Sequence, residues 1–390
     1  MKKTRGNITT KYALVQAAYW MSSCIISSYA SVYLLGEGFS NTQIGLLIGL
    51  AGAISTVMQP WVGAVVDRSE RITLRTMSLA FGLAMTILSA VLIVTRNKWF
   101  VAVVYSTLRV LFQVALPLVC AMGMDSINRG SNLNFGLARG IGSIAYAVLT
   151  SIIGFMAAAM GSHILAFGMF ATSGLFALGL QMFPREQNLL RQPEAMKEMS
   201  APGRAFFSKY PKFLLLVAGW TLAFTGYGLI SNFLFQIIES KGGDSTSMGI
   251  ALAISAISEV PTMFFFVVMV RKLKSGTWLR ISGIFFLFKI FGIFWFSNMA
   301  GIYVAHGFQM LGYALFSVAS VYYVNCLMEE HDKVRGQAYM TMTSTMGAVI
   351  GSTVGGAIID MFGIQVMLIA AVVIAAIGAV LIFRTTETKI

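Results

Sequence analysis

Long apolar runs, separated by short polar turns, fill almost the whole sequence. We place twelve of them at 12–35, 41–65, 73–95, 99–124, 133–158, 161–183, 211–238, 246–270, 278–296, 299–326, 336–359 and 363–383. Each has roughly 20 residues, the length that a helix needs to cross the hydrocarbon core of a bilayer. Because lipid offers no partner for backbone polar groups, each run must be helical. The sequence therefore predicts an all-α membrane protein with twelve transmembrane helices.

The composition excludes a soluble domain. Hydrophobic residues make up 57% of the chain and charged residues 11%, with a mean hydropathy of +0.77, whereas soluble proteins carry about 25% charged residues. A net charge of +13 would indicate nucleic-acid binding in a soluble protein. Here the basic residues gather in alternate loops, so we expect no nucleic-acid partner.

The loops also give an orientation. Lysine and arginine crowd the N-terminus, the turns after the second and eighth runs, the central loop and the C-terminus, while the opposite side carries only Arg96, Lys98 and Lys241. Loops rich in Lys and Arg stay in the cytoplasm. We therefore expect a protein of the bacterial cytoplasmic (plasma) membrane with both termini in the cytoplasm.

No catalytic or cofactor chemistry is visible in the sequence. The three cysteines lie in or beside apolar runs and lack the spacing of metal ligands. We find no ATP-binding motif, metal cluster or catalytic triad. We therefore expect no cofactor, no metal and no enzymatic activity, and we expect energy to come from an ion or solute gradient.

The chain divides into two similar halves. A polar segment, 184–210, separates six runs from six, so we predict an N-terminal bundle at 1–183, a cytoplasmic central loop, and a C-terminal bundle at 211–390. The charged turn Gln59–Arg75 has a weaker copy at Val270–Arg280. Repeated halves of this kind are typical of transporters that alternate access around a site at the membrane midplane.

The first charged turn reads QPWVGAVVDRSERITLR and contains the pattern G-x-x-x-D-R-x-x-R. With the twelve runs and the long central loop, it resembles the major facilitator superfamily over the whole chain. The resemblance implies two pseudo-symmetric six-helix bundles, a monomer, and a gate at the cytoplasmic helix ends. In that gate Gly63 would permit close helix contact, Asp67 would accept hydrogen bonds, and Arg68 and Arg71 would be gate partners.

Within the superfamily the chain is similar to the lactose permease and phenylpropionate permease group of proton symporters. The similarity rests on short segments, namely SNLNFGLAR at 131–139, Gly142, Tyr146, Gln59–Pro60 and Ser258–Glu259. It implies that Arg139 contacts substrate. The sugar permeases carry an acid on the fourth helix, where this chain has Ala121, with Asp125 one turn later.

Ionisable residues inside apolar runs cost at least a few kcal/mol to insert and usually face a cavity or a partner. Glu259 lies midway along run 246–270. It is a candidate proton carrier, because burial raises the proton affinity of a carboxyl; the alternative is a permanent ion pair with Lys289. Asp125 and His306 are further proton-coupling candidates.

Three cations lie in the runs, and we expect them to bind substrate: Arg139, Arg109 and Lys289. The alternatives are a structural pair of Arg139 with Asp125, hydrogen bonds from Arg109 to carbonyls beside Pro117, and snorkelling of Lys289. The excess of positive charge suits an organic anion, although arginine forks also bind the hydroxyls of a sugar.

Polar and aromatic residues are further substrate-binding candidates, with packing or an interfacial aromatic belt as the alternative for each. They are Tyr19, Ser23 and Tyr29 on the first run, Tyr227, Asn232 and Gln236 on the seventh, and Gln309 and Tyr313 on the tenth. Tyr19, Ser23 and Ser27 recur every four residues and should share a helix face. Gly347, Gly351 and Gly355 indicate close helix contact.

These features predict a secondary active transporter that carries a small organic solute (a sugar, a nucleoside, or an aromatic or organic acid) in symport with protons by alternating access. Its partners would be the solute, protons and membrane lipid. The alternative is a drug–proton antiporter, although the fifth run, GIGSIAYAVLTSIIG, lacks the proline typical of that subgroup. A uniporter and a non-transport membrane receptor or enzyme are further alternatives.

Overall fold

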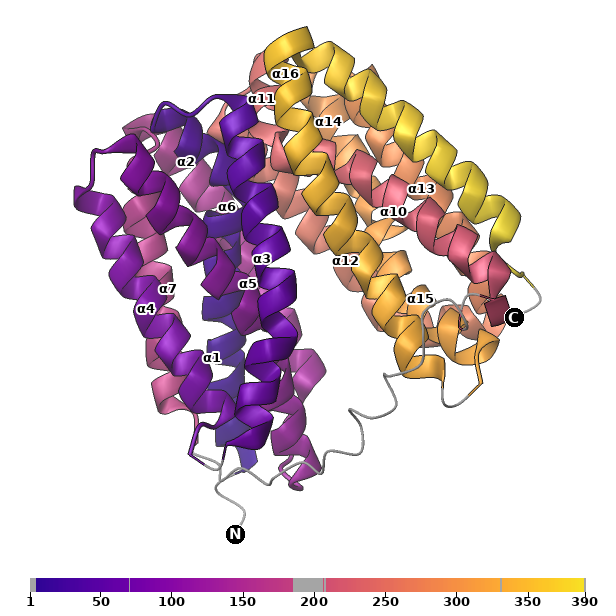
Figure 1. Cartoon of the computed structure of the whole chain (residues 1–390), viewed down its shortest axis with the longest axis horizontal. Helices are drawn as coiled ribbons and strands as arrows, with labels where there is room; N and C mark the ends of the chain where they lie inside the picture. The colour runs from indigo at the N-terminus through magenta and orange to yellow at the C-terminus, as the bar shows by residue number, and fades with distance from the viewer. Residues whose placement is uncertain (1–4, 70, 185–205, 207, 330–331, 389–390) are drawn as a thin grey trace. The chain divides into compact units, whose positions relative to one another are not determined.

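The computed structural model describes residues 5–69, 71–184, 206, 208–329 and 332–388, with a few side chains inside these ranges, including that of Asp67, left undescribed. Most of the predicted central loop, 184–210, therefore lies outside the described residues. The described part is helical and contains no strand (Figure 1). The all-α prediction is confirmed.

The helices follow one another with short connections. The first half contains α1 (Arg5–Ser23), η1 (Cys24–Ser28), α2 (Ala30–Gly36), α3 (Asn41–Arg68), α4 (Leu74–Val94), α5 (Lys98–Asn128), α6 (Phe135–Met160) and α7 (Ile164–Met182). The second contains α10 (Pro211–Asn232), α11 (Leu234–Ser240), α12 (Ser245–Lys272), α13 (Ser275–Trp295), α14 (Met299–Gly307), η3 (Phe308–Met310), α15 (Tyr313–Leu327) and α16 (Lys333–Thr385).

Nine segments among the described residues are long and apolar enough to cross a membrane. The segment Met299–Leu327 joins α14, η3 and α15 and matches the predicted run 299–326. The last segment differs from the prediction, because α16 covers both predicted runs after residue 335. Inside α16, Gly363 has φ 84° and ψ 170°, a left-handed conformation that favours glycine and divides the helix where a turn was expected. The exact count of twelve helices stays a prediction.

The chain forms two compact units. One comprises Met1–Arg191 with Asp244–Ala253, and the other comprises Gln192–Gly243 with Ile254–Ile390. We call these the first and second unit. The predicted boundaries at 183/184 and 210/211 stay predictions.

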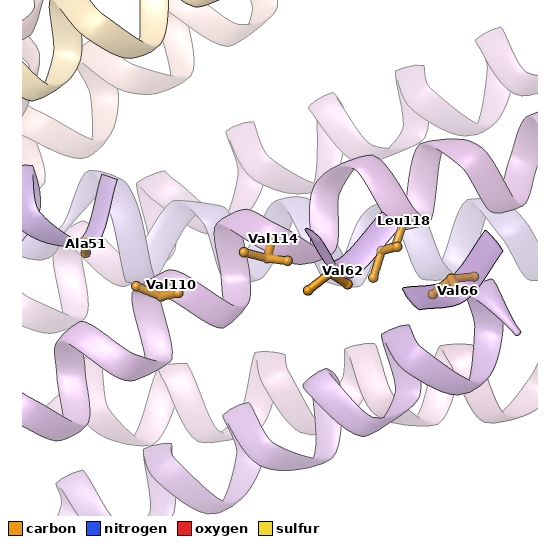
Figure 2. Close-up of a cluster of buried hydrophobic side chains, with 6 residues drawn as sticks. All are labelled: Ala51, Val62, Val66, Val110, Val114 and Leu118. Atoms are coloured by element: carbon orange, nitrogen blue, oxygen red, sulfur yellow. The ribbon is translucent and has the colours of Figure 1, made fainter. Parts of the chain in front are cut away.

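In the first unit, α3 and α5 pack through an apolar seam (Figure 2). Ala51, Val62 and Val66 come from α3, while Val110, Val114 and Leu118 come from α5 at four-residue spacing. Residues at this spacing share one helix face. The seam therefore fixes the rotation of α5 and directs Arg109, next to Val110, away from α3.

In the second unit, α10 and α16 run close together through glycine contacts, and Figure 1 shows α16 lying along α10. A Cβ atom added at Gly347 would lie 2.4 Å from Cβ of Phe224, and one at Gly351 would lie 2.8 Å from the backbone of Gly228. Both distances are shorter than real carbon contacts. The predicted close helix contact at these glycines is confirmed.

Each unit also contains an arginine that caps the end of a distant helix. Arg75, on α4, donates from Nε to the carbonyl of Leu180 (2.9 Å) and from Nη2 to that of Gln181 (2.7 Å), at the end of α7. Arg280, on α13, donates from Nη2 to the carbonyl of Thr386 (2.6 Å), just after α16. Cations at helix C-termini satisfy the last carbonyls and oppose the helix dipole.

Candidate functional site

The second unit contains a chain of three polar side chains from three helices. The ammonium group of Lys289 on α13 donates to Oε1 of Gln309 (2.6 Å), and Nε2 of Gln309 donates to Oε1 of Glu259 on α12 (2.7 Å). Lys289 and Gln309 are buried, and Glu259 is partly buried. An amide therefore bridges the acid and the base.

Two tyrosines lie beside this chain. The Lys289 ammonium group lies 5.0 Å from the ring centroid of Tyr227, a distance at which a cation is attracted to the ring face. The Tyr227 and Tyr313 rings are nearly parallel, with 6.4 Å between their centroids. The structure thus brings together five predicted site residues: Glu259, Lys289, Gln309, Tyr227 and Tyr313.

The helix that carries Gln309 is broken at that point. It passes from α14 into the 3-10 segment η3, and α15 begins only at Tyr313. Hydroxyl groups satisfy the carbonyls at the break: Thr262 donates to Met310 (2.8 Å) and Ser282 donates to Gly312 (2.8 Å). Discontinuous helices are common at the binding sites of secondary transporters, because they expose backbone and side-chain polar groups at the midplane.

His306 lies one turn before Gln309 and is 3% exposed. Its Nδ1 is 2.8 Å from the hydroxyl of Ser255 on α12, and its Nε2 has no hydrogen-bond partner among the described residues. The other predicted residues of this unit lie on α10 and α11. Asn232 donates to the carbonyl of Ala348 at 3.5 Å, and Gln236 is buried.

In the first unit, Arg139 on α6 stacks on Trp20 of α1. The guanidinium carbon lies 3.8 Å from the indole centroid, and Nη1 donates to the hydroxyl of Ser143 (2.8 Å). The indole N–H of Trp20 donates to Gln16 (3.1 Å), whose amide donates to the hydroxyl of Tyr12 (2.8 Å). The ring that supports Arg139 is thus held by its own hydrogen bonds.

Arg109 on α5 takes a different partner. Its Nη1 donates to the carbonyl of Ile26 (3.1 Å), which also accepts from the hydroxyl of Tyr105 (2.6 Å). Ile26 lies in η1, a π-helical segment, and such segments are frequent at functional sites. The sequence-based alternative placed these hydrogen bonds beside Pro117, whereas the acceptor belongs to the first predicted run.

Tyr19 and Tyr29 are buried, with 1% and 0% exposure. Their hydroxyls donate to the carbonyls of Phe112 (3.2 Å) and Thr150 (2.7 Å). Both side chains therefore pack inside the first unit. Packing was the alternative to substrate binding that the sequence offered for each of them. Ser23 ends α1 and is partly buried.

Asp125 lies near the end of α5 and pairs with Arg129 at 2.8 Å. The observed ion pair of Asp125 is therefore with Arg129, whereas the sequence-based alternative had paired Asp125 with Arg139. In the gate pattern, Arg68 and Arg71 are exposed. A Cβ atom added at Gly63 would meet no heavy atom within 4 Å, so the close helix contact implied for Gly63 is absent among the described residues. The side chain of Asp67 lies outside the described residues.

Sequence reasoning missed several residues that hold the site. Trp20 and Gln16 support Arg139, and their four-residue spacing on one run was the available signal. Ser255, Thr262 and Ser282 support the broken helix. Single hydroxyls in apolar helices are too common to be singled out, since most of them bond to their own backbone.

The comparisons with known proteins agree with the fold. The model of the MFS_1 like family matches residues 11–370. A protein of Deinococcus radiodurans described as a putative sugar efflux transporter is 23% identical, over 95% of this chain and 96% of the relative.

Two solved structures share the fold. One is the crystal structure of the nucleoside transporter NupG, with a TM-score of 0.77 and 15% identity over 97% of this chain and 98% of that chain. The other is a bacterial homologue of the human lysosomal transporter Spinster, inward-facing and unoccupied, with a TM-score of 0.66 and 14% identity over 100% and 98%. The chain belongs to the MFS_1 like family and is an integral membrane transporter of the major facilitator superfamily.

Proposed function

We propose that this transporter carries a small organic solute in symport with protons, and that Glu259 is the proton carrier. The bridge from Lys289 through Gln309 to Glu259 is the observation that carries the proposal. A carboxylate in this position can be neutralised in two ways, by its link to the lysine or by a proton. A solute that displaces the Gln309 amide would break the link to Lys289, so that a proton rather than the lysine would neutralise Glu259.

The remaining contacts of the site favour a polar solute with a ring. Tyr227 and Tyr313 offer ring faces, while Gln309 and Glu259 offer hydrogen bonds. A sugar, a nucleoside or an aromatic acid combines a ring with such polar groups. Arg139, held on Trp20 in the first unit, is a separate substrate-binding candidate with a guanidinium fork. The Deinococcus relative and NupG, which are described as sugar and nucleoside transporters, support the first two classes.

The other site predictions from the sequence belong to the same proposal. Tyr19, Ser23, Tyr29, Asn232 and Gln236 are secondary substrate candidates, and Asp125 and His306 are secondary proton carriers. The protein would act as a monomer with both termini in the cytoplasm. Arg68 and Arg71 would serve the cytoplasmic gate.

A second candidate is export of the same class of solute in exchange for protons. The description of the Deinococcus relative as a putative efflux transporter favours it. Both functions need a titrating carboxyl, so Glu259 takes the same role in each. They differ in the direction of proton movement relative to the solute.

The test is a proton flux measurement on the purified protein in liposomes, with a panel of sugars, nucleosides and aromatic acids. Symport predicts an inward proton current that starts with solute addition and is lost in Glu259→Gln. Glu239→Gln is the matched control, because Glu239 is exposed near the end of α11. Current that persists in Glu259→Gln moves the carrier to His306 or Asp125. Solute release driven by an opposing proton gradient, without inward co-transport, would establish the exchanger instead.

A further inference from the structure

The first unit contains a buried cation that has no carboxylate partner among the described residues. Arg109 is 6% exposed, and its Nη1 donates to the carbonyl of Ile26. Its Nε has no hydrogen-bond partner among the described residues. Arginine keeps its charge in proteins, and a buried donor without an acceptor costs free energy and calls for an explanation such as an ion.

No described carboxylate of the first unit forms an ion pair or hydrogen bond with Arg109. The acids of that unit are Glu37, Asp67, Glu70, Asp125, Glu186 and Asp244, of which Glu70 and Glu186 lie outside the described residues. The Asp244 carboxylate accepts from the backbone N–H (2.9 Å) and the hydroxyl (3.0 Å) of Ser247. Glu37 lies 3.4 Å from Nδ1 of His163, and Asp125 pairs with Arg129 at 2.8 Å. Asp125 also lies sixteen residues beyond Arg109 on the same helix, about 24 Å along its axis.

Of the two acids of the charged turn, only Asp67 lies on a described helix, and it lies at a different level along α5 from Arg109. Asp67 follows Val66, which packs in the seam with Leu118. Leu118 lies nine residues past Arg109 on α5, about 14 Å along the axis. Glu70 lies outside the described residues.

A second buried donor lies on the same helix. The hydroxyl of Ser106, three residues before Arg109, is buried and has no partner among the described residues. Residues three apart on a helix are neighbours on its surface. A guanidinium N–H and a serine hydroxyl can both donate to one acceptor, and charge-assisted hydrogen bonds of this kind are the strong ones.

We infer that Arg109 and Ser106 bind a small monovalent anion, either a halide or a carboxylate group. The carbonyl of Ile26, in π-helical segment η1, and the hydroxyl of Tyr105 hold the guanidinium in position for it. The anion comes from solution or is the carboxylate of the transported solute. The site is a property of the first unit and does not depend on proton coupling through Glu259.

Thermal unfolding of the purified full-length protein in detergent tests the site without any transport. Chloride or acetate is titrated at constant ionic strength against bulky methanesulfonate. We expect a saturable rise of the unfolding midpoint with chloride or acetate. In Arg109→Gln the apparent affinity should fall about tenfold or more, as the loss of a charge-assisted hydrogen bond implies. Ser106→Ala should lower the apparent affinity for the anion severalfold.

Arg75→Gln is the matched control. Arg75 is also buried, but its Nε and Nη2 already donate to carbonyls, so its loss lowers the midpoint and leaves the anion-dependent rise intact. A wild-type midpoint that is the same in every anion overturns the inference, as does an unchanged dependence in Arg109→Gln. If Arg109→Gln does not fold, the response of Ser106→Ala decides.

Uptake into liposomes then distinguishes the two sources of the anion. If the site takes the carboxylate of the solute, chloride competes with uptake of aromatic or organic acids. If it holds an ion from solution, uptake of a neutral solute requires chloride. Loss of proton coupling in Glu259→Gln affects neither midpoint titration, so failure of the proposed function and failure of this inference give different results.

Discussion

The two units treat their buried charges in opposite ways. In the second unit Lys289 and Glu259 come from neighbouring helices and are joined through Gln309, so the protein supplies both signs of charge. In the first unit Arg139 rests on the ring of Trp20, and Arg109 rests on a backbone carbonyl. Ring faces and carbonyls stabilise a cation without neutralising it.

The difference separates two tasks that a coupled transporter must perform. A joined acid and base can pass a proton from one to the other without a change in the net charge of the pair. Arg109, which has no carboxylate partner among the described residues, attracts an anion. On this view the second unit handles the proton and the first unit contributes the positive field. Substitutions of Lys289, Trp20 and Arg109 test that division.

The largest effect is expected for Lys289→Met. It leaves the Glu259 carboxyl linked to Gln309 without its base. Breaking a directly paired buried ion pair from one side costs about 3–5 kcal/mol, and we expect a loss near the lower end of that range, because an amide separates the two charges and Glu259 is partly buried. The double variant Glu259→Gln, Lys289→Met should regain most of the stability, because no uncompensated charge remains. Denaturant unfolding in detergent measures both. A single variant as stable as wild type would show that the two side chains are not energetically linked.

Trp20→Leu comes next. It removes the ring under Arg139, and a desolvated cation–π contact contributes about 2 kcal/mol. Trp20→Phe keeps a ring and should lose less than half as much. If Arg139 contacts the solute, the KM for uptake rises with the loss of the ring while the maximal rate changes less. Trp61→Leu is the control, since Trp61 is 64% exposed; an equal loss there would remove the special role of Trp20.

Two helix N-termini of the first unit give a smaller effect. Ser40 caps α3 by accepting from the backbone N–H of Gln43, and Asp244 caps α12 by accepting from that of Ser247 (2.9 Å). Replacing either cap by alanine should cost about 1 kcal/mol at neutral pH. Only the Asp244 cap should depend on pH.

The backbone N–H of Ser247 holds the pKa of the Asp244 carboxyl below its usual range. The stabilisation from this carboxylate is therefore complete above the unfolded value of about 3.9 and is lost as the pH falls through the lower folded value. The penalty of Asp244→Ala, measured as a difference in unfolding midpoint, should shrink in acid while that of Ser40→Ala stays constant. If the penalties of Asp244→Ala and Ser40→Ala changed with pH in the same way, this prediction would be wrong.

The smallest change in stability is expected for Arg109→Met in buffers without small anions. Replacing an uncompensated buried charge by an apolar side chain removes a desolvation cost. This gain offsets the lost hydrogen bond to Ile26, which still accepts from Tyr105. We expect a net change below about 1 kcal/mol. A loss as large as that of Lys289→Met would show that a protein group compensates Arg109 and would break the comparison.

Much of the fold was predictable from the sequence. The helical class, the membrane character and the close contacts of Gly347 and Gly351 follow from hydrophobic length and small-residue spacing, and the structure confirms them. The structure also brings the predicted site residues Glu259, Lys289 and Gln309 together. The helix that carries each polar residue was predictable because the apolar runs define the helices.

Rotation about the helix axis was harder to predict, because helix breaks change it. The four-residue spacing of Tyr19, Ser23 and Ser27 assumed a continuous α-helix. The π-helical segment Cys24–Ser28 interrupts it, and the wider turn shifts every later residue around the axis. The break from η3 to Tyr313 has the same effect on the tenth run. The pairing of Arg139 with Trp20 rather than Asp125 depends on such rotation, which a single sequence does not contain.

The arginine caps bear on how the chain is assembled as it is synthesised. The carbonyls that Arg75 needs come 105 residues later, and the one that Arg280 needs comes 106 residues later, close to the end of the chain. The first arginine can thus find its partners as soon as α7 has been made. The second must wait until α16 is complete. We expect the first half to close while the ribosome is still translating the second, and short C-terminal truncations to leave only the second half unfinished.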